Sequence, residues 1–288
     1  HNILWNTAYC DFYSRDNYAI LRDEKALSDL ENLLAFWQRV DACDGFSDGI
    51  LRRFYVLKYA PNSMWTFFVS VWYLANGKPD GVVEDEDALL SFLDLITGFI
   101  FVYAVERPGV NALRSPVYPE MINVVNHLPV TFENYKFERG DIAARFRAYV
   151  FTNVRPITKS MLVWWAFSDE KQKLLPWDTV IEVEHIYARK RSDTSPLKNQ
   201  SNLEALGNKA ILEKRVNIRA SDYRFEDKKK HYLGYRTSKG QLKGGADVHE
   251  LVELANNCDD FSEADIEART SKIIESFVDY LGSVNLLK

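Results

Sequence analysis

Two long stretches of the sequence lack the charged side chains that a water-exposed helix would carry. Tyr59–Gly77 has no charge over 19 residues, and Asp94 alone interrupts the apolar part of Glu84–Glu106. Polar residues leave the first stretch with a continuous apolar core only from about residue 64 to residue 75, too short to span a bilayer. We therefore expect both stretches to form buried helices of a protein without a membrane span, and such helices require a large core around them.

The composition agrees with a packed protein. Of the 288 residues, 47% are hydrophobic and 14% are aromatic, which excludes a disordered or low-complexity scaffold. The 36 basic and 41 acidic side chains give a net charge of −5, so the chain as a whole is not a histone-like polycation. Its three cysteines, Cys10, Cys43 and Cys258, lie far apart and form no disulfide framework or CxxC metal motif. A reducing, cytoplasmic location is the expectation.

The sequence up to about residue 172 has the patterns of helices. Further helices are expected near residues 119–128, 141–151 and 157–167, and nothing here resembles a phosphate loop or a catalytic triad. An amphipathic helix is predicted near the start of the chain by a stripe of apolar residues on one face of a 3.6-residue period, namely Leu27, Leu30, Leu33, Leu34 and Trp37.

The pattern changes near Pro176. Residues 179–186 are β-branched and alternating, which predicts a strand, and a polar segment from Arg189 to Asn202 follows as a loop. A second strand is expected over residues 208–212 and a helix from residue 213. Three more helices are expected, over residues 225–233, 248–255 and 262–281. The sequence thus predicts strand, long loop, strand and helix in succession.

Positive charge is concentrated between Ile186 and Gly245. This segment has 15 lysines and arginines against six acidic residues, a local charge of +9, whereas the rest of the chain sums to −14. A local basic field is what a phosphate-binding surface requires, because phosphate contacts draw affinity from counterion release. A solvated, lysine-rich surface would have the same charge, and charge alone does not separate these two interpretations.

One set of side chains in this part could carry chemistry. It consists of Glu184 and His185 on the first strand, Asn208 at the start of the second strand, and Asn217 on the helix. Phosphodiester hydrolysis needs a base of near-neutral pKa, for which histidine is the natural choice. An amide or carbonyl oxygen nearby can fix the tautomer of that ring, and glutamate and asparagine oxygens suit Mg²⁺. Adjacent residues of a regular strand point to opposite faces, so Glu184 and His185 can share a site only where the strand ends or twists.

The same residues carry a family resemblance. The segments Glu184–Tyr187 (Glu-His-Ile-Tyr), 206–212 (Leu-Gly-Asn-Lys-Ala-Ile-Leu) and 221–228, with Asn217, resemble the HNH (ββα-metal) nuclease domain that closes GmrSD-like and SspE-like restriction and phage-defence proteins. Eight residues separate the two asparagines, which is similar to the Asn-x8-His/Asn spacing of many HNH motifs. The resemblance covers roughly residues 177–281. It departs from the family pattern at Ala188, where proline is common, and at Lys209, where leucine is common.

The resemblance implies an α+β, mostly α-helical fold, with an α-helical domain over residues 1–172 and an HNH-type ββα-metal nuclease domain over residues 173–288. The implied activity is that of a metal-dependent DNA endonuclease, cutting one strand or both. His185 would be the general base, Asn208 would orient it, and Glu184 with Asn217 would hold Mg²⁺, with Mn²⁺ or another divalent ion as a substitute.

The implied substrate is double-stranded DNA, foreign or modified, and target choice would rest on an N-terminal NTPase or sensor domain that is not in this chain. Residues of the basic segment are expected to contact the DNA: Arg189, Lys190, Arg191, Lys209, Lys214, Arg215 and Lys228. Two alternatives stay open, a catalytically silent nucleic-acid-binding module and an RNA-directed or structure-selective nuclease with the same site. Taken singly, a Glu-His pair on a strand is more often structural than catalytic.

Overall fold

The computed structural model describes residue 14 and residues 17–109 and 111–288, and it has the expected mostly α-helical, α+β class. The helices before residue 172 are α2 (Ala19–Arg22), α3 (Glu24–Ala42), α4 (Asp48–Leu57), α5 (Met64–Asn76), α6 (Glu86–Glu106), α7 (Arg114–Val125), α8 (Arg139–Ala148) and α9 (Pro156–Ser168), with short 3-10 turns η2 (Pro79–Gly81) and η3 (Glu133–Tyr135). The later elements are β1 (Ile181–His185), α10 (Arg189–Thr194), η4 (Gln200–Glu204), η5 (Leu206–Asn208), β2 (Lys209–Glu213), α11 (Lys214–Ala220), α12 (Phe225–Leu233), β3 (Tyr235–Arg236), β4 (Leu242–Lys243), α13 (His249–Asn257) and α14 (Glu263–Ser283).

Local sequence signals set the starts of the long helices. The Asp85 side chain accepts a hydrogen bond from the Ala88 N–H at 2.9 Å and so caps α6. α14 begins with a capping box in which Ser262 and Asp265 satisfy each other's backbone N–H groups. Pro156 occupies the first position of α9, where its fixed φ costs nothing. These caps place the helix starts within a few residues of the expected ones.

Both apolar stretches form helices, as predicted. Most of α6 is buried among other helices, whereas α5 buries one face and leaves Phe67 and Leu74 exposed. Among the described residues, α6 is the one helix long and apolar enough to cross a membrane by length and composition, and 67% of its apolar window is buried inside the fold. Burial of this kind is what the central helix of a packed protein shows.

Three leucines of the predicted α3 stripe do not face the core, whereas Leu33 and Trp37 pack against it. The predicted helix is present, but Leu27, Leu30 and Leu34 keep 61%, 63% and 59% of their surface exposed. Phe36 of the same helix is fully buried and stacks on Tyr73 at a ring-centroid distance of 4.4 Å. Because an aromatic ring buries more surface than a leucine, the rotation of α3 about its axis follows Phe36.

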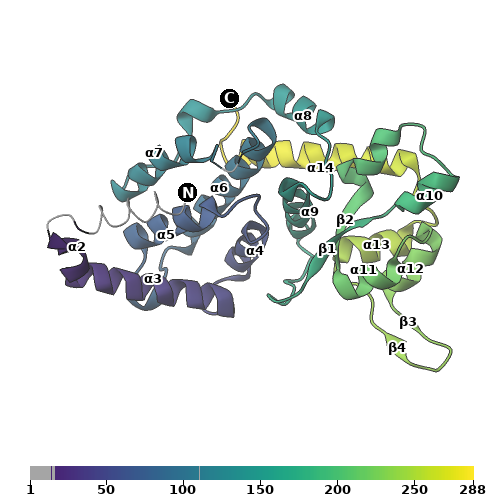
Figure 1. Ribbon diagram of the computed structural model, residues 1–288, viewed down its shortest axis with the longest axis horizontal. Helices are drawn as coiled ribbons and strands as arrows, with labels where there is room; N and C mark the ends of the chain where they lie inside the picture. Colours follow the sequence, from purple (N-terminus) through teal and green to yellow (C-terminus); the bar gives the residue numbers. More distant parts are fainter. Residues whose placement is uncertain (1–13, 15–16, 110) are drawn as a thin grey trace.

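The two halves of the chain share one core. Figure 1 shows α14, in yellow, lying along the upper side of the molecule and reaching from the hairpin region to the N-terminal helices. α14 contacts η4 and η5 near the hairpin, and it also contacts α6 and α8. Buried apolar side chains from Phe36 to Leu286 form a single cluster. The division between residues 172 and 173 stays a prediction, and packing is continuous across it.

The predicted strands pair with each other as an antiparallel hairpin. Ile181 lies opposite Glu213 and His185 lies opposite Lys209, and α11 begins directly after β2. The connection between the strands, expected as a loop, contains α10 and η4. A second small hairpin, β3–β4, was not predicted. Helices α12, α13 and α14 lie close to the expected ranges, and α12 matches its range to the residue.

Candidate functional site

The hairpin and α11 build the framework of the candidate site. Every residue of β2 is buried, because α9 covers the sheet while α11 packs on both strands. Gly207, just before β2, allows the tight approach of α14: a Cβ at this position would lie 2.0 Å from the Ile266 carbonyl oxygen. The ends of β1 and β2 are therefore held against rigid helices, which suits side chains that must keep a fixed geometry.

His185 is the last residue of β1, and its ring is nearly enclosed. Only 10% of the side chain is exposed, and the buried Nε2 atom has no hydrogen-bond partner. The nearest carboxylate is that of Glu204, whose Oε1 lies 3.6 Å from Nε2. Burial, together with the nearby charges of Lys209 and Arg189, lowers the pKa of His185 to about 3. The imidazole is therefore neutral at pH 7 and has a free lone pair.

Lys209 is a buried cation, not a surface residue. Its side chain is fully enclosed, and Nζ donates to Glu204 Oε2 at 2.6 Å, to Asn153 Oδ1 at 2.8 Å and to the Phe151 carbonyl. Burial alone would raise the pKa of Glu204, but the hydrogen bonds and charges of Lys209 and Arg189 lower it. Three protein oxygens already bind the ammonium group, so the predicted contact of Lys209 with DNA would require these hydrogen bonds to break.

Glu184 lies on the other face of β1 and is also enclosed. Its Oε1 accepts hydrogen bonds from Lys228 Nζ at 2.7 Å and from the Tyr232 hydroxyl at 2.6 Å. Lys228 donates as well to the His185 carbonyl at 2.6 Å, and only 1% of its side chain is exposed. Burial raises the pKa of Glu184, and the ion pair with Lys228 opposes this rise. The predicted contact of Lys228 with DNA would likewise require its hydrogen bonds to Glu184 and to the His185 carbonyl to break.

Asn208 fixes the backbone that follows His185. Its fully buried amide accepts from the Tyr187 N–H at 2.7 Å and donates to the Tyr187 carbonyl at 3.1 Å and the Leu203 carbonyl at 3.0 Å. The expected hydrogen bond from Asn208 to the imidazole is not made. Asn208 therefore acts on the ring only indirectly, by holding the chain just after it.

Asn217 meets a carboxylate that the sequence analysis overlooked. Its Nδ2 donates to Glu182 Oε2 at 2.7 Å, which leaves the amide oxygen free to accept another group. Glu182 stands two residues before Glu184, and residues two apart in a strand share a face. The two-residue alternation of a strand could therefore have indicated that Glu182 lies on the same face as Glu184, one of the predicted site residues.

The expected DNA-binding residues divide into exposed and engaged groups. Arg191 pairs with both Asp260 oxygens at 2.7 Å and lies over the Tyr187 ring, with 14% of its side chain exposed. Four of the predicted residues lie on the surface, namely Arg189, Lys190, Lys214 and Arg215. Two of these are also in ion pairs, Arg189 with Glu204 at 2.6 Å and Arg215 with Asp247 at 3.0 Å.

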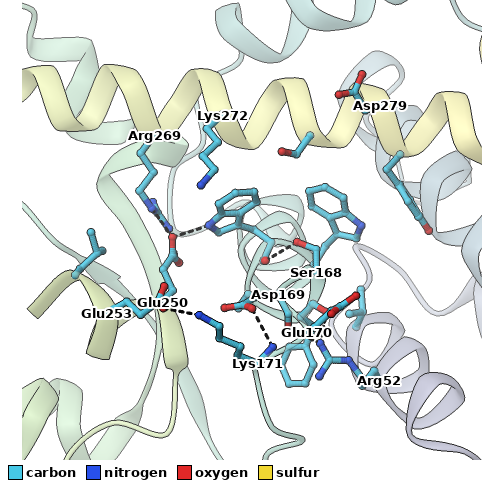
Figure 2. A pocket seen from close by; sticks show the side chains of 18 of the residues that line it. Arg52, Ser168, Asp169, Glu170, Lys171, Glu250, Glu253, Arg269, Lys272 and Asp279 are labelled. Atoms are coloured by element: carbon cyan, nitrogen blue, oxygen red, sulfur yellow. Dashed lines mark hydrogen bonds and ion pairs between the residues drawn. The ribbon is translucent and has the colours of Figure 1, made fainter. Parts of the chain in front are cut away.

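Two cavities lie near this region, and they differ in charge. The α9–α14 pocket has a volume of about 1270 Å³, and eight acidic against five basic side chains line it, which disfavours a polyanion. Two of its lining residues, Asp169 and Glu253, form with His249 the one His/Asp/Glu group among the described residues that has metal-site spacing. Figure 2 shows Lys171 beside Glu253, and the two side chains pair at 3.2 Å, which offsets part of the negative charge of this group. Glu182 and Asn217 line the second cavity.

The site thus consists of two antiparallel strands and a helix, with a buried imidazole whose Nε2 lies 3.6 Å from the Glu204 carboxylate. Residues 136–276 match the family model of the GmrSD restriction endonucleases, C-terminal domain. This segment, just under half of the chain, is similar to that family, which confirms the predicted resemblance. The match supports a restriction-endonuclease-type nuclease module in this chain. Comparisons with curated proteins and with solved structures give no match.

Proposed function

We propose that the β1–β2–α11 unit is an HNH-type site that hydrolyses phosphodiester bonds of double-stranded DNA, with His185 as the general base. The observation that carries the proposal is the neutral, buried imidazole whose Nε2 has no hydrogen-bond partner. A nitrogen in this state can take the proton of an attacking water. With a pKa of about 3 the ring is a weak base in the free protein, and a phosphate bound beside it would raise that pKa.

The surrounding residues have roles that follow from their contacts. Lys209 and Arg189 keep the ring unprotonated before substrate binds, because their charges disfavour the imidazolium. Asn208 holds the backbone at Tyr187 and so fixes the end of β1 that carries the ring. Glu204 lies 3.6 Å from Nε2 and would stabilise the imidazolium that forms when the proton is taken.

A divalent cation is implied by the resemblance, and the predicted ligands carry oxygen donors. Glu182 and the amide group of Asn217 form one pair, and Glu184, bound to Lys228, offers a second carboxylate; such oxygens are the ligands that Mg²⁺ or Mn²⁺ prefers. When bound, such an ion supplies charge stabilisation for the leaving oxygen. Lys228 already neutralises Glu184 through Oε1, so we add Glu182, which touches Asn217, to the predicted ligands Glu184 and Asn217.

The biological role we propose is restriction of foreign or modified DNA. The family of residues 136–276 supports this role, because its members are restriction endonucleases. Recognition of the target would belong to an upstream sensor or NTPase domain of the same system.

Plasmid cleavage tests the assignment. Supercoiled DNA is incubated with the protein and Mg²⁺, Mn²⁺ or EDTA, and His185→Ala is compared with His127→Asn, a control on an exposed loop. We expect cleavage by the parent and the control only with metal, and a loss of at least about 100-fold in His185→Ala, the usual range for a general base. Cleavage by His185→Ala at the parental rate would overturn the proposal.

A catalytically silent DNA-binding module is the second candidate. The ion pair between Glu184 and Lys228 favours it, because a neutralised carboxylate binds metal less strongly. The missing hydrogen bond between Asn208 and the imidazole favours it as well. Salt-dependent DNA binding by the parent, with no cleavage in either metal, would support this candidate. Cleavage of structured RNA but not of plasmid would instead indicate an RNA-directed nuclease.

A further inference from the structure

A second cavity joins the N-terminal helices to the candidate site. The β1 pocket has a volume of about 680 Å³, and it is lined by Lys58, Tyr59, Ala60, Asn153, Val154, Arg155, Pro156, Lys159, Glu182, Val183 and Asn217. The helical part thus supplies one wall, and β1 and α11 supply the other. Three basic side chains face a single acid, and that acid is already hydrogen-bonded to Asn217 at 2.7 Å. This balance is opposite in sign to that of the α9–α14 pocket.

Two of the three cations are held in fixed positions. Lys159 Nζ donates to the Ile181 carbonyl at 2.6 Å and lies 5.1 Å from the centre of the Tyr59 ring. Lys58 Nζ donates to the Trp177 carbonyl and lies 4.8 Å from the Trp177 ring. Burial lowers the pKa of both ammonium groups, so each would be stabilised by an anion that entered the pocket.

Arg155 completes the basic set from the start of α9. Its guanidinium lies 4.5 Å from the Tyr149 ring, and among the described residues no carboxylate pairs with it. Arginine held on an aromatic ring with its donors free is well suited to phosphate. The first turn of α9 also lines the pocket, and the positive end of its helix dipole adds to the attraction for an anion.

The β1 pocket is connected to the proposed base. Glu182 and Val183 line it and stand on the same strand as His185. Asn153, another lining residue, accepts from Lys209 at 2.8 Å, and Lys209 in turn binds Glu204 beside the imidazole. An anion in the pocket would therefore lie next to the network that surrounds the ring.

We propose that the β1 pocket binds a backbone phosphate of the DNA substrate, so that the helical part forms one side of the DNA-binding surface. The proposal rests on the nuclease function proposed above and names binding residues, Lys58, Arg155 and Lys159, that lie outside the basic segment. In this arrangement the DNA contacts both the helical part and the β1–α11 side of the pocket, and exposed Lys214 on α11 provides a further contact.

The test measures binding separately from cleavage. Fluorescence anisotropy with a labelled 20-base-pair duplex is recorded in EDTA at several salt concentrations. The parent is compared with Arg155→Gln, with the double variant Arg155→Gln/Lys159→Gln, and with Lys25→Gln, a charge-matched control on α3, whose side chain is 75% exposed. Arg155 is exposed, so its single variant remains informative if the double variant is unstable.

We expect the double variant to bind on the order of tenfold more weakly at 0.1 M salt, with a salt slope smaller by about one for each lost phosphate contact. Arg155→Gln should show about half of the change in slope, and Lys25→Gln none. Three outcomes would each overturn the proposal. The first is an unchanged affinity and salt slope in both pocket variants, and the second is that the parent does not bind DNA. The third is that only duplex RNA shows binding that depends on the pocket.

Failure of the nuclease function gives a different pattern. Pocket-dependent DNA binding without plasmid cleavage would refute the nuclease and keep the pocket. Plasmid cleavage at the parental rate by the pocket variants, with unchanged binding, would refute the pocket and keep the nuclease.

Discussion

The enclosed imidazole of His185 makes the stability of the fold dependent on pH. In the unfolded chain a histidine titrates near 6.5, whereas in the fold its pKa is about 3. Between these values the unfolded chain binds the proton and the fold does not, so stability must fall as the pH drops through this window. At pH 5 the two pKa values correspond to a loss of about 2 kcal/mol relative to neutral pH.

Urea denaturation of the parent and of His185→Gln checks this number. Other titrating groups are common to both proteins, so the difference in unfolding free energy between them isolates His185. We expect the parent to lose about 2 kcal/mol more than His185→Gln between pH 7.5 and pH 5. An independent measurement follows the imidazole resonances by NMR, which should stay in the neutral form down to pH 5. A free-energy difference that is constant over this range would refute the reasoning.

Three further predictions concern the elements that hold the site. Replacing buried Arg269 with methionine removes donors from the carbonyls of Leu206, Gly207 and Lys209, and should lower the unfolding free energy by about 3–5 kcal/mol in urea. Gly207→Ala should lower the melting temperature clearly, because its Cβ would lie 2.0 Å from a carbonyl of α14; a shift below one degree would contradict the close approach. Burial would raise the pKa of Asp169, but hydrogen bonds from Lys171 and His249 lower it below its usual value. The carboxylate therefore stabilises the fold above about pH 4, and this contribution is lost as the pH falls further. In Asp169→Asn, the free energy of unfolding should decrease less steeply at acidic pH than in the parent.

The sequence predicted the order of elements around the site well, because local signals determine it. The alternation of residues 179–186 and the caps of α9 and α14 are contained in a few neighbouring residues, and the structure has β1, α9 and α14 close to the expected positions. The short helix α10 was missed because its polar sequence has no apolar period, and it begins after Ala188 without a side-chain cap.

The partners of the site residues could not be predicted, because they come from distant parts of the chain. Lys209 looks like a surface lysine in sequence, yet the oxygens that enclose it include the Phe151 carbonyl, 58 residues earlier. Lys228 likewise reaches Glu184 across 44 residues. A buried lysine and an exposed one have the same local pattern, so only the fold separates them.

The exposure of three leucines on α3 could not be predicted for a related reason. Period 3.6 identifies the helix, but two apolar faces compete on it, and the position of Tyr73 decides between them. The β1 pocket could not be predicted from sequence either. Its basic side chains come from two helical segments that lie outside residues 186–245, where the sequence concentrates positive charge.

The C-terminal helix makes the β1–β2 hairpin inseparable from the rest of the molecule. Through Arg269, α14 binds the carbonyls at the start of β2, and toward its other end Tyr280 donates to the Asp94 carbonyl of α6 at 2.6 Å. If the hairpin were grafted into another protein, α14 and the part of α6 that it contacts would have to be included. Recombination between relatives should therefore succeed at exposed loops such as the tip of β3–β4, and fail at any crossover that separates α14 from α6.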